Sequence, residues 1–504
     1  MQQYVARTVS GGRVRGVSHN GVTRFLGIRY GAAPTGERRW RRAEPAAWSG
    51  TFEATAYAPL APQLDTRLSS TGIMPAVLDL LYPRGGSPAE NGTVSEDSLA
   101  LNIWAPDGAE GLPVLVWLHG GGYVHGAGSE QVFAGDQLAR SGRAVVVSIN
   151  HRLGLTGFLA LEHLLGSEWR DSENAGLTDI VLALRWISEN IASFGGDPDK
   201  VTIFGQSGGG AKVAALTAIP EAEGLFRGGI IQSGVARWVG SEADARELTG
   251  LVLEAAKIPE YDAELLLELP LRYLLHLQGS LGAVTGWRPT VGTAFMPHRP
   301  FSAGVAPKVP MLIGHATHES TLFLCEREDW AEITEAAALE ALAGSHGDNA
   351  RAALAASIAS EGSVQLALAK EHTAVTFGRS AALALERSTA AAAYGYRFDY
   401  RTEAADGLLG ATHSLDLAFV FGTTRSIPMA GDRAERFAVS EAMQQSWLSF
   451  AETLRPGHAG LPEWPAYTAA EPAQMVFGVD PRLEQTEPLP EGIHPPASWF
   501  DAVD

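Results

Sequence analysis

Apolar residues along this chain are concentrated in short runs, with one longer stretch that has a helical repeat. The runs lie at 99–104, 114–118, 144–149 and 201–204, and mostly apolar runs of this length are typical of strands buried on both faces. From Gly176 to Phe194, large apolar side chains recur every three or four residues, as they do along an amphipathic helix. This alternation of strand, helix and strand predicts a mostly parallel twisted sheet with helices on both faces.

The remaining segments extend this α/β pattern in both directions. Residues 1–60 alternate in short glycine-broken segments that suit antiparallel strands at a sheet edge, and 62–95 read as a long loop. A late strand is expected at 394–400, after the segment Val309 to Ile313. No repeat or linker divides the chain, so we expect one domain over residues 1–504, with helical cap-like regions near 240–290 and 328–392 bordering a cleft.

Composition narrows the class of protein. With 45% hydrophobic and 19% charged residues the chain is expected to be globular, and its net charge of −19 argues against partners such as nucleic acid or an anionic membrane. Cys325 is the single cysteine, and the N-terminus carries no signal-like apolar stretch. No run approaches the ~20 apolar residues that cross a bilayer. We expect a cytoplasmic protein, monomeric or dimeric.

A serine between glycines follows the last buried run. Gly205-Gln206-Ser207-Gly208-Gly209 has the form G-x-S-x-G, with helix-forming residues after it. A strand that turns this sharply into a helix needs neighbours without side chains, and it exposes the central serine to a substrate. The alternative is an ordinary glycine-rich turn with a solvated serine.

A second glycine run, His119-Gly120-Gly121-Gly122-Tyr123, follows the buried segment 114–118. Glycines leave backbone N–H groups uncovered, and fixed N–H donors are what stabilises the oxyanion of acyl transfer. The run is otherwise a plain flexible turn, but lipases and esterases combine it with a downstream G-x-S-x-G.

A serine nucleophile needs a base, and the base needs a carboxylate that orients it. His413 follows the late strand and Glu319 follows the segment ending at Ile313, which gives the hydrolase order of serine, acid, histidine. A hydrogen-bonded loop histidine is the alternative for His413. His315 and His318 beside Glu319 match neither zinc signature, so we expect no metal.

Collinear motifs across nearly the whole chain resemble the type-B carboxylesterase family of α/β-hydrolases. They include E-D-S-L-A-L-N-I-W at 96–104, N-H-R-L-G at 150–154, F-G-G-D-P at 194–198 and W-P-A-Y at 464–467. The resemblance implies the α/β-hydrolase fold. It also implies Ser207 as nucleophile, His413 as base and Glu319 as acid, with an oxyanion hole formed by the N–H groups of Gly121, Gly122 and Gly208.

The same resemblance implies further positions. Arg39 would pair with Glu96 and Arg152 with Asp179 as structural ion pairs. Trp238 and Phe323 fall near positions that line the acyl pocket in relatives, although either could equally be plain core.

We therefore expect a serine esterase that cleaves small-molecule carboxylic esters through an acyl-enzyme, without metal or organic cofactor. The same residues could attack amides, carbamates or lactones. A non-catalytic binding protein, as in neuroligin-like relatives, is the alternative from another class, but such proteins have usually lost a member of the triad.

Overall fold

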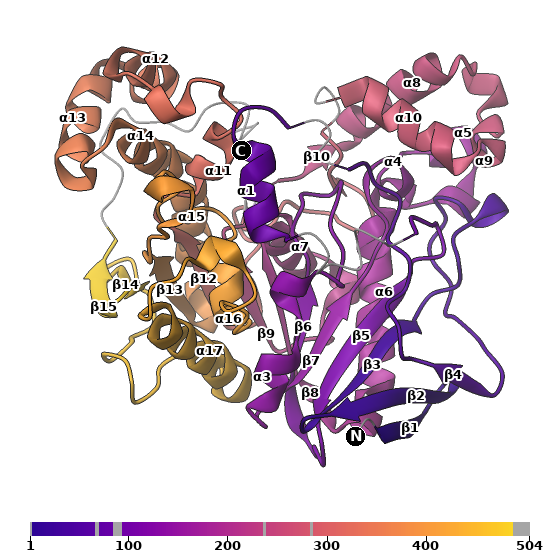
Figure 1. Ribbon diagram of the computed structural model, residues 1–504. Coiled ribbons are helices and arrows are strands. Elements are labelled where there is room, and N and C mark those ends of the chain that lie inside the picture. The colour runs from indigo at the N-terminus through magenta and orange to yellow at the C-terminus, as the bar shows by residue number, and fades with distance from the viewer. Residues whose placement is uncertain (1–2, 66–69, 84–92, 235–237, 283–285, 487–504) are drawn as a thin grey trace.

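The computed structural model describes residues 3–65, 70–83, 93–234, 238–282 and 286–486. Its centre is a 13-stranded sheet in the order β1-β2-β3-β5-β7-β6-β8-β9-β12-β13-β14-β15, with β4 beside β2 (Figure 1). The strands of this sheet are β1 (Gln3–Val9), β2 (Gly12–His19), β3 (Val22–Arg29), β4 (Thr51–Glu53), β5 (Ala100–Pro106), β6 (Leu112–Leu118), β7 (Val145–Ile149), β8 (Gly196–Gln206), β9 (Gly228–Gln232), β12 (Met311–Ala316), β13 (Ala393–Phe398), β14 (Ala473–Phe477) and β15 (Arg482–Gln485). A small second sheet pairs β10 (Gly240–Ser241) with β11 (Thr290–Val291).

Strand direction follows the pattern read from the sequence. The pairs β1/β2, β2/β3, β3/β5 and β5/β7 are antiparallel and form one edge. From β7 through β6, β8, β9, β12 and β13 to β14 every neighbouring pair is parallel. The expected antiparallel edge and mostly parallel centre are confirmed.

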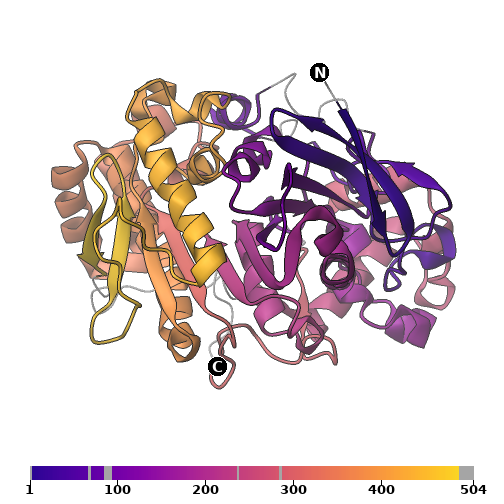
Figure 2. The same cartoon turned by 90° about the horizontal axis from the view of Figure 1, so that it is seen from below.

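The buried strands separate two cores because successive side chains point to opposite faces. Along β6, Leu115 and Trp117 join the core on one face of the sheet, whereas Val114, Val116 and Leu118 join the core on the other. Seen from below, helices lie on both sides of the strands (Figure 2). The core with Leu115 and Trp117 is covered by α16 (Leu415–Val420) and α17 (Arg436–Thr453). The opposite core is covered by α6 (Ala175–Asn190), α7 (Gly208–Thr217) and α15 (Arg379–Ser388).

Two groups of helices stand beyond the carboxyl ends of the parallel strands, at the upper corners of Figure 1. One group contains α8 (Glu242–Ala256), α9 (Leu265–Glu268) and α10 (Leu271–Leu281), and the other α12 (Glu335–His346), α13 (Ala350–Glu361) and α14 (Val364–Thr373). Ligands of parallel α/β sheets bind outside the carboxyl ends of the strands. The two groups therefore border the end of the sheet at which a site is expected.

The expectation of a continuous loop at 62–95 is wrong in its centre, where α1 (Met74–Leu81) stands between the two helical groups. Pro75 occupies its first turn, where a proline costs no hydrogen bond, and Met74, Val77 and Leu81 are buried along one face. Only two turns long, α1 carries too short a repeat to stand out among the turn-forming residues around it. Residues 66–69 and 84–92 of that segment lie outside the described residues.

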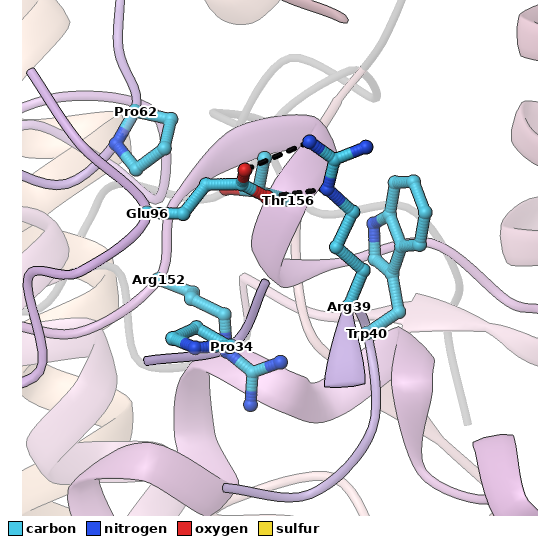
Figure 3. A pocket seen from close by; sticks show the side chains of 7 residues that line it. All are labelled: Pro34, Arg39, Trp40, Pro62, Glu96, Arg152 and Thr156. Atoms are coloured by element: carbon cyan, nitrogen blue, oxygen red, sulfur yellow. Dashed lines mark hydrogen bonds and ion pairs between the residues drawn. The ribbon is translucent and has the colours of Figure 1, made fainter. Parts of the chain in front are cut away.

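Two expected ion pairs are confirmed, and both are structural. The Arg39 guanidinium donates to both carboxylate oxygens of Glu96 at 2.6 and 2.8 Å, beside a cavity of about 10 Å³ (Figure 3). Arg39 also donates to the backbone carbonyls of Leu267 and Leu269, which ties the N-terminal segment to the α8–α10 group. Arg152 and Asp179 form a second bidentate pair at 2.8 and 2.6 Å that is almost wholly buried.

In the described ranges, no single helix is both long and apolar enough to cross a bilayer. One pair of helical segments, Glu335–Glu361 and Val364–Ser388, satisfies the length and composition only when taken together, and the two are bent by 119°.

Candidate active site

The turn between β8 and α7 holds Ser207 at φ 57° and ψ −125°, a conformation that residues with a side chain rarely adopt. The flanking glycines are required by space. A Cβ on Gly205 would lie 2.4 Å from the carbonyl carbon of Gly209, and one on Gly209 would lie 2.0 Å from the carbonyl oxygen of Leu118. Glycine is therefore required at both positions of G-x-S-x-G, because the start of α7 lies close to the ends of β8 and β6.

The glycine run after β6 lies against this turn. A Cβ on Gly208 would lie 2.2 Å from the carbonyl oxygen of Gly122, and one on Gly120 would lie 3.5 Å from the Cβ of Ser207. Gly121 and Gly122 have φ of 83° and 63°, the left-handed region that favours glycine. The structure thus brings Gly121, Gly122 and Gly208 together beside Ser207.

Glu319 and His413 meet because two loops pair along their backbones. The His318 N–H donates to the Ala411 carbonyl at 2.9 Å, and the Ala411 N–H donates to His318 Nδ1 at 3.1 Å. The next residue on one loop is Glu319, which follows β12 and precedes α11 (Ser320–Leu324). The Nδ1 of His413 hydrogen bonds to the Oε2 of Glu319, and both side chains are buried.

The carboxylate of Glu319 is held in its charged form. Burial by itself would raise its pKa, but His413 and the Ala316 N–H, which donates to Oε1 at 2.5 Å, together lower the pKa below its usual value. A carboxylate at Nδ1 is an acceptor, so the neutral ring carries its proton on Nδ1 and keeps a lone pair on Nε2.

That lone pair points to the nucleophile turn. The Gln206 side-chain amide nitrogen lies 3.1 Å from His413 Nε2, and its Oε1 accepts a hydrogen bond from the Ser414 hydroxyl at 3.2 Å. Gln206 immediately precedes Ser207, so the histidine lies at the turn that exposes the serine. The sequence marked Gln206 only as the x of the motif; its contact with the histidine was missed, because nothing local to the motif shows which side chain faces position 413.

Aromatic side chains lie beside two parts of the site, the histidine His413 and the glycine run that ends at Tyr123. Phe323, 41% exposed, has its ring centroid 5.2 Å from that of His413, and Phe377 lies 5.1 Å from His413 on centroids. Trp238 instead packs on the oxyanion loop, with its centroid 5.4 Å from that of Tyr123 and its ring 2.9 Å from where a Cβ of Gly122 would be. The two expected pocket residues therefore adjoin different parts of the site.

Phe377 was not anticipated from the sequence. It lies in a π-helical turn, Ala374–Gly378, between α14 and α15, and such turns recur at functional sites. Their sequence pattern is that of an ordinary helix, so no local signal distinguishes this position.

The histidines near Glu319 take protein partners. His315 Nδ1 lies 2.9 Å from the Ala316 carbonyl oxygen, and His318 Nε2 lies 3.1 Å from Glu361 Oε2. Among the residues whose positions are described, no three His, Cys, Asp or Glu side chains are grouped as a metal site would require.

Comparison with known proteins identifies the family of this chain. The carboxylesterase family pattern matches residues 3–489. The chain is 34% identical to the para-nitrobenzyl esterase of Bacillus subtilis (strain 168), over 96% of this chain and 98% of that one, and 33% identical to the phenmedipham hydrolase of Pseudarthrobacter oxydans, over 94% and 95%.

Solved structures give the same result. A crystal structure of a Geobacillus stearothermophilus carboxylesterase superposes with a TM-score of 0.80 at 35% sequence identity, covering 95% of this chain and 97% of that one. Because the family match and these relatives span almost the whole chain, this protein belongs to the carboxylesterase family and is a carboxylic ester hydrolase with the α/β-hydrolase fold.

Proposed function

We propose that the protein cleaves small-molecule carboxylic esters through a covalent acyl-enzyme on Ser207, with His413 as base and Glu319 as the acid that orients it. The observation that carries the proposal is the buried hydrogen bond between His413 Nδ1 and Glu319, which leaves the other ring nitrogen, Nε2, facing the turn that bears Ser207. The strained backbone of Ser207 supports the same assignment, since strain of this kind persists at active sites.

In the acylation step the Ser207 oxygen bonds to the ester carbonyl carbon while its proton passes to His413 Nε2. The Gln206 amide N–H must break its hydrogen bond to Nε2 for this transfer, while the Gln206 Oε1 keeps its hydrogen bond from the Ser414 hydroxyl. The carbonyl oxygen becomes an oxyanion, held by the N–H groups of Gly121, Gly122 and Gly208. When the carbonyl re-forms, the C–O bond to the alcohol breaks and the alcohol leaves with the proton from His413.

Deacylation repeats these steps with water. His413 takes a proton from the water that attacks the acyl carbon, and returns it to the Ser207 oxygen as the acid leaves. Glu319, charged throughout, stabilises the imidazolium formed in each half-reaction.

We assign the two aromatic groups to substrate binding. Phe323 with Phe377 would contact the part of the ester nearest the histidine, and Trp238 the part nearest the oxyanion loop. In the same proposal residues 1–504 act as one domain, with the helical groups near 240–290 and 328–392 as walls of the site.

The test is a burst experiment with para-nitrophenyl acetate and butyrate on the wild type and on Ser207→Ala, with intact-mass detection of the acyl adduct. Turnover and an adduct in the wild type, both absent from Ser207→Ala, support the proposal. A folded wild type that turns esters over while no adduct forms on Ser207 would exclude the covalent mechanism. Anilide, carbamate and lactone analogues in the same assay rank the other acyl substrates.

A further inference from the structure

A lysine is buried beneath the oxyanion loop and has no role in the chemistry described above. Lys212 lies on α7, five positions after Ser207, and its side chain is inaccessible to solvent. Its Nζ donates to the backbone carbonyl of His119 at 2.9 Å and lies 5.4 Å from the centroid of the Tyr123 ring. These two residues flank the glycine run on either side.

The carbonyls of His119, Gly120 and Gly121 at the start of this loop each have a hydrogen-bond partner. Lys212 Nζ holds that of His119, the His119 ring Nδ1 lies 2.9 Å from that of Gly120, and the N–H groups of Val124 and His125 donate to that of Gly121 at 3.2 and 3.1 Å. The C=O and N–H of one trans peptide unit point in opposite directions. Holding the carbonyls of Gly120 and Gly121 therefore fixes the N–H groups of Gly121 and Gly122 facing away from them.

We propose that Lys212 is a positioning residue for the oxyanion hole, which anchors the start of the glycine run through the His119 carbonyl and places a buried positive charge behind it. The inference rests on the proposed function of this loop. A hydrogen bond to the carbonyl of His119 polarises that peptide and the chain of hydrogen bonds that follows it. A cation behind the loop stabilises the negative charge that develops in front of it.

The groups around Lys212 leave it as the one that titrates near neutrality. Burial lowers its pKa to about 7. His119, His125 and His151 face it, and burial followed by the charge of Lys212 lowers their pKa values, that of His125 to about 4.

The other neighbours do not offset this charge. Burial raises the pKa of Tyr123, so it stays neutral. The charge of Arg152 also lowers the pKa of His151, but Arg152 is itself paired with Asp179. Within the described ranges no carboxylate pairs with Lys212. The ammonium charge is thus present below neutral pH and lost above it.

The experiment compares Lys212→Met, which removes donor and charge, with Lys212→Gln, which keeps an N–H donor without charge. Val213→Ala is the matched control, because it disturbs the next buried position of α7, whose side chain lies against β9 at Gly229. For each folded variant, kcat and KM for para-nitrophenyl butyrate are measured from pH 6 to 9, after the wild type has been shown to form its acyl-enzyme. That first step separates a failure of the proposed function from a failure of this inference.

For Lys212→Met we expect kcat to fall on the order of tenfold at pH 6.5 with KM changed less than about twofold, because one indirect donor is lost from the transition state. The ratio of wild-type to variant kcat should shrink toward pH 9 as the wild type loses its charge. The loss of kcat that remains at high pH comes from the missing hydrogen-bond donor. Lys212→Gln keeps a donor, so it should recover this part of the kcat.

The thermal midpoint of Lys212→Met should stay close to that of the wild type, since removing a buried cation stabilises the fold while the His119 carbonyl loses its donor. Val213→Ala should lower the thermal midpoint and leave the kcat ratio independent of pH. A kcat ratio for Lys212→Met that does not vary with pH, or a loss confined to KM, would refute the proposal. If Lys212→Met does not fold, the same criteria apply to Lys212→Gln.

Discussion

The strained backbone of Ser207 makes a quantitative prediction about stability. At φ 57° and ψ −125° a residue with a Cβ costs about 1–3 kcal/mol, which glycine avoids. Against this, glycine gains more freedom in the unfolded chain than alanine does, about 0.4–1 kcal/mol. Ser207→Gly should therefore be more stable than Ser207→Ala by about 1–2 kcal/mol, although both lose the nucleophile.

The difference can be measured by differential scanning fluorimetry or calorimetry at one scan rate. At ~2.1 cal/mol/K per residue, unfolding of all 504 residues gives about 1 kcal/mol per kelvin, so the glycine variant should melt about 1–2 °C higher. Ser188 is the control, because it is exposed within α6 and glycine there should be less stable than alanine by about 1 kcal/mol. If alanine is equally or more stable than glycine at both positions, the strain argument is wrong.

Three further predictions follow from buried charges. Glu319→Gln should lower kcat by about 10²–10⁴ with little change in KM, because the amide no longer stabilises the imidazolium; steady-state kinetics would contradict this if KM alone changed. Burial raises the pKa of Asp416 to about 7, so the folded state retains a proton that the unfolded state loses, and wild-type stability falls as pH rises from about 4 to 7. Asp416→Asn keeps an acceptor for Gln232, and its thermal midpoint relative to wild type should be higher at pH 8 than at pH 5; a constant difference would exclude the linkage. Asp179→Ala should cost about 3–5 kcal/mol in denaturant unfolding by stranding Arg152, and the double variant Arg152→Met/Asp179→Leu should cost less than Asp179→Ala alone.

The contact between Gln206 and His413 bears on how the resting site is organised. In the described structure the base accepts from the residue before the nucleophile, at 3.1 Å. This contact holds the imidazole in the tautomer that Glu319 also selects, and it costs one hydrogen-bond exchange when Ser207 reacts.

Features that depend on a few adjacent residues could be predicted from the sequence alone. The turn at Ser207 is one, because the 2.4 Å approach between a Cβ on Gly205 and the carbonyl carbon of Gly209 arises within the ten residues of the motif itself. Buried strands are another, as in β6 and the second half of β8, since short runs of mostly apolar residues carry side chains to bury on both faces. The short helix α1 is the counterexample. Its residues have only a weak local preference for a helix, and packing of one face against the core decides that the helix forms.

Features that join distant residues were decided by the tertiary structure. Glu319 and His413 are 94 residues apart, and their contact depends on the pairing of the His318 and Ala411 backbones, which no local pattern encodes. The same holds for Phe377 beside the histidine, and for Lys212, whose sequence context is an ordinary helix but whose ammonium group is enclosed under the oxyanion loop. Local sterics and hydrophobic periodicity can be read from the sequence, whereas burial, and with it the charge state and partner of each polar group, exists only once the chain has folded.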